Sequence, residues 1–96
     1  MAVKRLVIDV LIPHDPDIIE FSESLAAIHG VDGVTVHVLE IDEKTKTIEI
    51  TVEGHELTYN EIEEVIEAHG GSIHSIDMVS AGKKLIDSQV TRREEE

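Results

Sequence analysis

The sequence contains no cysteine and no tryptophan, and its aromatic rings are limited to Phe21 and Tyr59, apart from histidine. The absence of cysteine excludes a disulfide framework, a thiolate zinc site and an iron–sulfur cluster, and it leaves the redox compartment open. Stacking on nucleic acid bases is nearly unavailable with so few aromatic side chains. The core must therefore be built from isoleucine, valine, leucine and alanine.

Basic side chains are also scarce. The chain has 8 lysine and arginine residues against 21 aspartate and glutamate residues, which gives a formal net charge of −13. This charge repels phosphate backbones and anionic membranes, and it favours cations or basic proteins as partners. We therefore expect neither nucleic acid nor membrane binding.

The chain lacks the features of a secretory signal. Residues 1–5 lead directly into an extended apolar segment that contains Asp9, and no cleavage site follows. No apolar run approaches the length needed to span a bilayer. These observations predict a cytoplasmic protein.

The segment Val3–Ile12 is predicted to be the central strand of the fold. Its even positions are all apolar, whereas its odd positions mix apolar and charged groups, so one face is expected to be buried and the other half-buried. Such a strand fits an antiparallel sheet that is covered by helices on one side. The even positions are Leu6, Ile8, Val10 and Ile12, and the odd ones include Arg5, Val7, Asp9 and Leu11.

A first helix is predicted after this strand. Asp15 is the expected N-cap, Pro16 occupies the first helical position, and apolar residues at helical spacing continue to about His29. Gly30 stands where a left-handed C-cap is expected.

Two strands joined by a hairpin turn follow. Val34–Ile41 and Lys46–Glu53 both alternate with a period of two, and the polar segment 42–45 between them is typical of a turn. One face of the earlier strand is expected to present Val34, Val36 and Val38 to the core.

A second helix and a last strand complete the pattern. Thr58 and Glu61 have the spacing of a capping box, and the helix is expected to continue to His69. The last strand, Ser72–Ala81, is ambiguous in its alternation. We predict that Ile76 and Met78 face the core, and the alternative places Ile73 and Val79 there.

The predicted order β-α-β-β-α-β indicates an α+β fold. Each half has a strand, a helix that ends in His-Gly and a second strand, and right-handed crossovers close such a duplication into a ferredoxin-like sandwich. Four antiparallel strands then carry both helices on one face, with the first strand in the interior. We expect this domain at residues 1–82 and a C-terminal tail at 83–96 that is partly disordered or packs on a neighbouring subunit. The alternative is an open α+β layer with another strand order.

Three segments carry a resemblance to a known family. The sequences at 70–83, 5–11 and 13–14 resemble a small archaeal family catalogued as domain of unknown function 211, and the resemblance extends to about Leu85. It implies a ferredoxin-like fold in an archaeal cytoplasm, and it supplies no catalytic residues because the family has no established activity. The family motif continues Ile-Asp with a glutamate, where this chain has Met78.

Acidic side chains are expected to gather on the sheet face that the helices leave open. Hard oxygen ligands without thiols suit Ca²⁺ or Mg²⁺, so a divalent cation is the predicted ligand, with no organic cofactor. The simpler alternative is that these acids pair with Arg5 or face solvent. The face would hold Arg5 and Thr51 beside the predicted metal ligands Asp9, Asp77, Glu49 and His37.

No catalytic constellation is recognisable, so the protein is not expected to be an enzyme. The glycine pairs do not precede helices in the manner of phosphate loops, and the histidines form no helical His-x-x-x-His pair. An enzyme that uses His14 with Asp15 or Asp17 is the weakest hypothesis. The same end of the fold, with Asp42 and Glu43, is a second candidate cation site.

These patterns predict a non-enzymatic, oligomeric binding module. The alternative is an acidic regulatory or scaffolding subunit that binds a basic protein through Glu61, Glu64 and Glu67.

Self-association is expected because a sheet face that exposes aliphatic side chains is commonly an interface. We expect a homo-oligomer, with a closed ring ahead of a simple dimer. The aliphatic residues assigned to the open face are Val7, Leu11, Leu39, Ile41 and Val79, and the tail adds Leu85, Ile86 and Val90.

Overall fold

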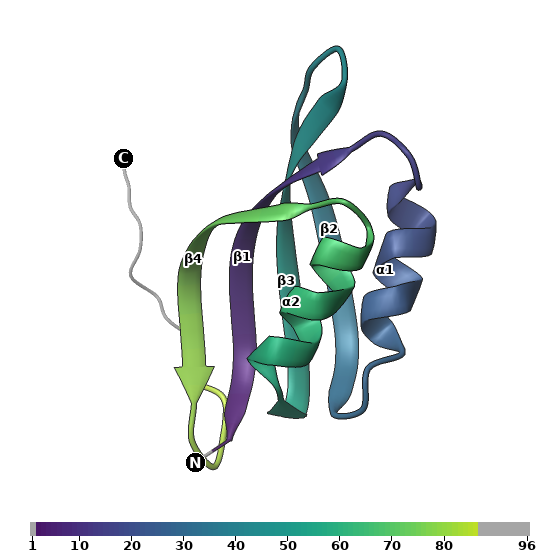
Figure 1. Cartoon of the computed structure of the whole chain (residues 1–96). Coiled ribbons are helices and arrows are strands. Elements are labelled where there is room, and N and C mark those ends of the chain that lie inside the picture. Colours follow the sequence, from purple (N-terminus) through teal and green to yellow (C-terminus); the bar gives the residue numbers. More distant parts are fainter. Residues whose placement is uncertain (1, 87–96) are drawn as a thin grey trace, which may run out of the picture.

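The computed structural model describes residues 2–86 of the chain, which form one four-stranded sheet and two helices (Figure 1). The elements follow the order that the sequence predicts. Their bounds are β1 Val3–Pro13, α1 Ile18–Ala26, β2 Val31–Ile41, β3 Thr45–Leu57, α2 Tyr59–Ala68 and β4 Ser72–Ala81.

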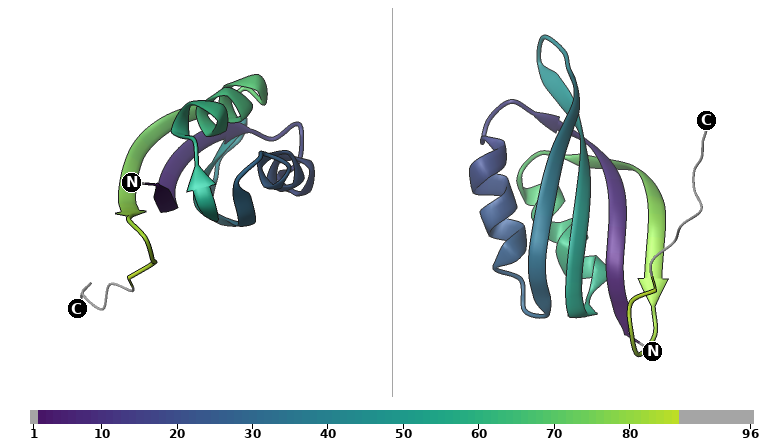
Figure 2. Two further views of the ribbon diagram at one scale, coloured as in Figure 1. Left: turned by 90° about the horizontal axis from the view of Figure 1, so that it is seen from below. Right: turned by 180° about the vertical axis from the view of Figure 1, so that it is seen from behind.

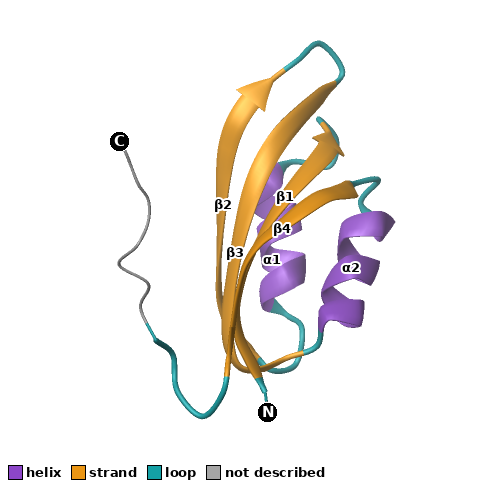
Figure 3. Cartoon of the chain, turned by 90° about the vertical axis from the view of Figure 1, so that its left-hand side faces the viewer, coloured by secondary structure: helices purple, strands orange, loops and turns teal. Residues whose placement is uncertain are grey.

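The sheet has the strand order β2-β3-β1-β4, and every neighbouring pair is antiparallel. Both helices lie on the same side of the sheet (Figure 3), and the view from behind shows the four strands with no helix in front of them (Figure 2, right). The predicted α+β, ferredoxin-like arrangement with β1 in the interior is therefore confirmed. The side of the sheet that carries α1 and α2 is its covered face, and the opposite side is its open face.

The core fills the space between the covered face and the helices. Alternate residues of β1 and β3 point into it, and Ile8, Ile48 and Ile50 have no exposed surface. The strict alternation in β1 explains why this strand could be predicted from sequence. The buried side chains are Leu6, Ile8, Val10, Ile12, Phe21, Leu25, Ile48, Ile50, Val52, Leu57, Ile62 and Ile66.

Helix α1 begins later and ends earlier than the sequence predicts. The N-cap is Asp17, whose side chain accepts a hydrogen bond from the Glu20 N–H at 2.9 Å, whereas Asp15 and Pro16 lie in the preceding turn. A carboxylate that accepts from the third residue beyond it satisfies an orphan amide of the first turn, and Asp17 does so for Glu20. Gly30 has the predicted positive φ, +95°, but lies three residues beyond the C-cap Ala27.

Helix α2 begins after Thr58, as predicted, but the reciprocal bonds of a capping box are not formed. The Thr58 side chain makes no capping hydrogen bond. The other end is well closed: Gly71 N–H donates to the Ile66 carbonyl and Gly70 N–H to the Glu67 carbonyl, both at 2.9 Å, with Gly70 at a φ of +82°. This is a Schellman motif, and it depends on the left-handed conformation that glycine adopts at low cost.

The predicted faces of β4 are wrong in part: Ile76 lies on the covered face as predicted, whereas Met78 does not. Between Leu6 and Val10 the register of β1 with β4 shifts twice, so that Leu6 lies opposite Val79, Ile8 opposite Ile76 and Val10 opposite Ile73. Directly opposed residues share a face, so the two bulges turn three residues at a spacing of three toward the covered face. Val7 lies opposite Met78, which places Met78 on the open face. Ile73 packs against the core, whereas Ile76 and Met78 are 46% and 37% exposed.

Two aliphatic residues that the sequence predicts on the open face lie on the covered face instead. Val79 lies opposite the buried Leu6, and Ile41 lies opposite Lys46, which is itself opposite the buried Ile12. A register shift between Val38 and Glu40 causes the change in β2. Ile41 is nevertheless exposed: it is the last residue of β2, and the β2–β3 hairpin extends beyond both helices (Figure 1).

The chain after β4 turns to the open side of the sheet (Figure 3). Gly82 N–H donates to the Ala2 carbonyl at 2.9 Å, and Leu85 and Ile86 are both exposed. Of the predicted tail at 83–96, residues 87–96, including Val90, lie outside the described part.

Candidate functional site on the open face

A row of polar side chains crosses the open face of the sheet. His37 of β2 lies opposite Glu49 of β3, Glu49 lies opposite Asp9 of β1, and Asp9 lies opposite Ser75 of β4. Opposed residues share a face, so these four side chains project from the same side. The structure thus brings together Asp9, Glu49 and His37, three of the four residues that the sequence predicts as metal ligands.

Asp77, the fourth predicted ligand, does not join the row. It falls at the bulge between Ile76 and Met78, and its Oδ1 accepts a hydrogen bond from Ser75 Oγ at 2.7 Å. Ser75 lies opposite Asp9, and the bulge inserts an extra residue in β4 at Asp77.

Asp9 and Glu49 form the electrostatic centre of the row. Both are half-buried, and neither side chain has a hydrogen bond or an ion pair with any residue of the described range 2–86. Like charges directly opposite each other in an antiparallel pair destabilise it. The two carboxylates therefore form a local concentration of negative charge in the middle of the sheet.

Arg5 and Thr51 lie further along the same face. Arg5 Nε donates to Glu53 Oε2 at 2.8 Å, within the pair of opposed residues one row beyond Val7 and Thr51. The Arg5–Glu53 bond is thus a contact across the β1–β3 pair, separate from the opposed pair of Asp9 and Glu49.

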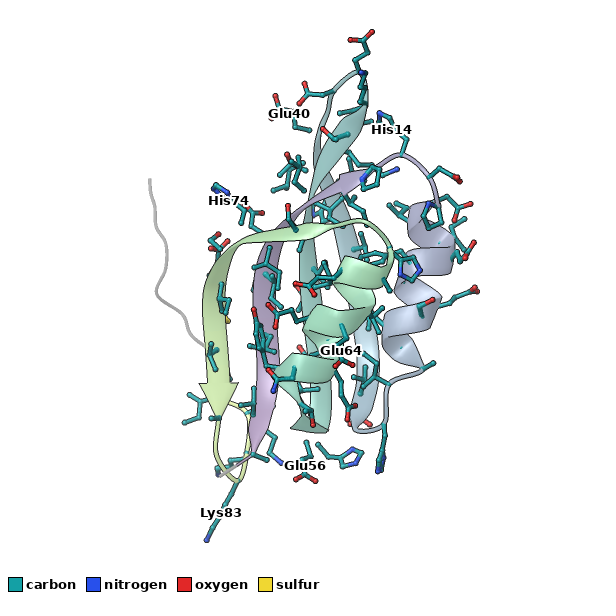
Figure 4. The ribbon with its side chains drawn as sticks, viewed as in Figure 1. His14, Glu40, Glu56, Glu64, His74 and Lys83 are labelled. Carbon is teal, nitrogen blue, oxygen red and sulfur yellow. The ribbon has the colours of Figure 1, made fainter. Side chains whose placement is uncertain are left out.

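A shallow hollow of about 300 Å³ adjoins the row, lined by Asp9, Leu11, Thr47 and His74. His74 occupies the second bulge of β4, and Figure 4 shows it at the outer edge of that strand, toward the hairpin end. Sequence reasoning did not select His74 because bulges are not visible in an alternating pattern. A second hollow of about 360 Å³ includes Asp32, Thr35, Thr51 and Glu53 in its lining.

A single chain offers few ligands to a metal ion on this face. Within residues 2–86, no group of three or more histidine, aspartate or glutamate side chains is arranged to hold a metal ion. Asp9 and Glu49 alone can supply two oxygen ligands to a hard cation, and the remaining ligands must be water or groups from outside this face.

The hairpin end brings His14 against the β2–β3 turn. The Asp42 carbonyl accepts a hydrogen bond from His14 Nε2 at 2.8 Å, and Figure 4 shows His14 and Glu40 at this end. The carbonyl is an acceptor only, so Nε2 carries the proton. His14 therefore has a structural role as a link between the loop after β1 and the hairpin.

No helix in the described part of the chain combines the length and the hydrophobicity that crossing a bilayer requires.

Comparison with known proteins identifies the family. Residues 4–95 match the model of DUF211, described as "Uncharacterized ArCR, COG1888". The chain is also 46% identical over 85 residues to "Uncharacterized protein MJ0319" of Methanocaldococcus jannaschii, an alignment that covers 88% of each chain. Neither description names an activity, a ligand or a partner. The chain belongs to the archaeal DUF211 family.

Proposed function

We propose that the protein is a non-enzymatic binding module that assembles into a homo-oligomer in the cytoplasm. Its ligand is a divalent cation, Ca²⁺ or Mg²⁺, held at Asp9 and Glu49 on the open face. A closed ring is the assembly that we favour over a dimer.

The opposed carboxylates of Asp9 and Glu49 are the observation that carries this proposal. They lie on the two central strands, are half-buried, and have no hydrogen bond or ion pair with another described residue. A cation between them replaces a repulsion by two attractions, and the formal net charge of −13 raises the local concentration of cations. Oxygen ligands select Ca²⁺ or Mg²⁺ over softer metals.

The need for further ligands links cation binding to assembly. Two carboxylates leave most of the six to eight positions of a Ca²⁺ ion to water or to a second subunit. The open face also carries aliphatic side chains, among them Leu11 and Met78, that are exposed in the single chain. A second copy against this face covers these side chains and encloses the cation.

Cation binding is tested by titration of chelator-treated protein with Ca²⁺ and with Mg²⁺, followed by calorimetry and by thermal unfolding. We expect heat of binding and a higher Tm for the wild-type chain, and loss of both in Asp9→Asn and in Glu49→Gln. Glu64→Gln is the matched control because this side chain is exposed on α2 (Figure 4). Absence of heat and of thermal stabilisation in the wild type contradicts the cation proposal.

Assembly is tested by light scattering on the intact chain and on a chain truncated after Lys84. We expect a monodisperse oligomer for the intact chain. A monomer at micromolar concentration rejects the oligomer. Unchanged assembly after truncation assigns the contact to the open face, whereas dissociation assigns it to the tail.

Helix α2 supports an alternative function as an acidic scaffolding subunit. Glu61, Glu64 and Glu67 are exposed on this helix and have no ion pair with other residues of the described part. Such a surface fits a basic protein partner. Capture of a partner from native lysate that weakens steeply with added salt, and that is lost in the triple glutamine variant, favours this alternative. Capture that is unchanged between low and high salt counts against it.

A further inference from the structure

Two histidines from distant parts of the chain meet at the end of the molecule opposite the hairpin. His29 lies in the loop after α1, and His55 lies in β3 beside Glu56, which Figure 4 shows at this end. The centroids of the two imidazole rings are 6.2 Å apart, and the ring planes are inclined by 75°. Both side chains are exposed.

Two glycines fix the backbone on which these histidines stand. Val31 pairs with Gly54, and the Gly30 carbonyl accepts a hydrogen bond from the Glu56 N–H at 3.5 Å. A Cβ on Gly30 would collide with the Glu56 carbonyl oxygen, and a Cβ on Gly54 would collide with the Gly30 carbonyl oxygen. Because His29 and His55 are the chain neighbours of these glycines, the close backbone approach sets their separation.

Asp32 contacts the imidazole ring of His55, and Lys4 contacts its backbone. His55 Nδ1 lies 3.3 Å from Asp32 Oδ1, and the His55 carbonyl accepts a hydrogen bond from Lys4 Nζ at 2.9 Å. When the neutral ring donates from Nδ1 to the carboxylate, the lone pair of Nε2 is available for a ligand. A carboxylate behind an imidazole in this way is the usual outer-shell arrangement of metal-binding histidines.

We propose that His29 and His55 form a binding site for a transition-metal dication of the Zn²⁺ or Ni²⁺ type. Imidazole nitrogens select such metals over Ca²⁺ and Mg²⁺. Asp32 is a positioning residue for His55, and water completes the coordination shell. The site is thus chemically and spatially distinct from the pair Asp9 and Glu49 on the open face.

The geometry requires only side-chain rotation to bind the metal. Zinc–nitrogen bonds of about 2.0–2.1 Å place two nitrogens of a tetrahedral site roughly 3.3 Å apart. Both rings are exposed and their centroids lie 6.2 Å apart, so rotation about χ1 and χ2 can bring one nitrogen of each ring to this separation. The backbone is already fixed, so binding orders two side chains and no loop.

The test is calorimetric titration of the metal-free, full-length chain with Zn²⁺ and separately with Ni²⁺, in the absence of Ca²⁺ and Mg²⁺. We expect binding to the wild type and at least tenfold weaker binding to His29→Gln and to His55→Gln. Asp32→Asn is expected to weaken binding by about 10- to 100-fold, as outer-shell changes do. His74→Gln, which removes an exposed histidine from the open face, is the matched control and is expected to bind like the wild type.

Nitrogen NMR of the imidazole rings provides a readout that a purely structural role does not change. Zinc is expected to shift the His55 Nε2 resonance of the wild type, and Asp32→Asn is expected to alter the His55 tautomer in the metal-free chain. The proposal is overturned if the wild type binds neither metal, or if the double variant His29→Gln/His55→Gln keeps wild-type affinity. Circular dichroism verifies that each variant is folded before titration. The result is independent of Ca²⁺ binding, so either proposal can fail without the other.

Discussion

The two faces of the sheet use the same strands for different purposes. On the covered face, alternate residues of β1 and β3 such as Ile8 and Ile50 have no exposed surface. On the open face, their immediate neighbours Asp9, Glu49 and Thr51 are half-buried and polar or charged. Successive residues of one strand are thus divided between a buried apolar core and a half-buried polar surface, because a strand turns adjacent side chains to opposite sides.

The largest change in the free energy of unfolding is expected from a substitution on the covered face of β3. Ile50→Ala is expected to lower the free energy of unfolding by about 2–5 kcal/mol, because it removes a fully buried side chain and leaves a cavity. Thr51→Ala, one residue along β3 on the open face, is expected to change it by no more than about 0.5 kcal/mol. Urea denaturation measures both values, and equal costs for the two variants would contradict the division between faces.

An intermediate effect is expected at β4, where the helices cease to cover the sheet. Ile73 packs against the core and Ile76 is 46% exposed, although both lie on the covered face. Ile73→Ala is expected to cost roughly 1–2 kcal/mol, and Ile76→Ala less than about 1 kcal/mol, in proportion to the apolar area each buries. A larger cost at Ile76 than at Ile73 would contradict the exposure of the Ile76 side chain.

A smaller effect of opposite sign is expected on the open face. Asp9→Asn is expected to raise the free energy of unfolding of the chelator-treated chain by about 0.2–1 kcal/mol, because it removes a like-charge cross-strand pair. The gain is expected to shrink in high salt, which screens the repulsion that it relieves. Glu64→Gln on α2 is the control in the same denaturation series, and loss of stability in Asp9→Asn would show that this carboxylate has a stabilising partner.

The smallest effect concerns Tyr59 in the first turn of α2. Burial raises the pKa of its phenol above the usual 10.0, and the negative charges of Glu63 and Glu67 raise the pKa further. Tyr59 loses its proton at a lower pH in the unfolded chain than in the folded one. Its contribution to the free energy of unfolding is therefore fully present below about pH 10, and it falls as the pH rises toward the pKa of the folded state. Tyr59→Phe is expected to reduce this alkaline loss, as measured by urea midpoints at about pH 9 and about pH 11. An identical pH dependence in both chains would contradict the assignment.

Most of the fold was predictable because its signals are local. The alternation in β1 and β3, the helical spacing of Phe21 and Leu25, and Gly70 after α2 each reflect a period or a cap that the sequence displays directly. The start of α1 was misplaced because Asp15 and Asp17 both qualify as N-caps, and only the hydrogen bond to Glu20 distinguishes them.

The candidate site was less predictable because it depends on register between strands. Asp9, Glu49 and His37 fell into one row because β1, β2 and β3 pair without a shift at these positions. Asp77 lies outside the row and His74 lines the adjoining hollow because both stand at bulges of β4, and a bulge depends on tertiary pairing instead of local sequence. The contact of His29 with His55 arises from the close approach of Gly30 and Gly54, which no pattern along the chain indicates.

The β2–β3 hairpin extends past both helices, and its tip is held by the 2.8 Å bond from Asp42 N–H to the Thr45 carbonyl and by His14. Glu43 and Lys44 between these anchors are exposed. A foreign peptide inserted between these two residues displaces no buried side chain and breaks neither anchoring bond. The hairpin tip is therefore a position for displaying an epitope or a fluorescent label, far from the end that carries His29 and His55.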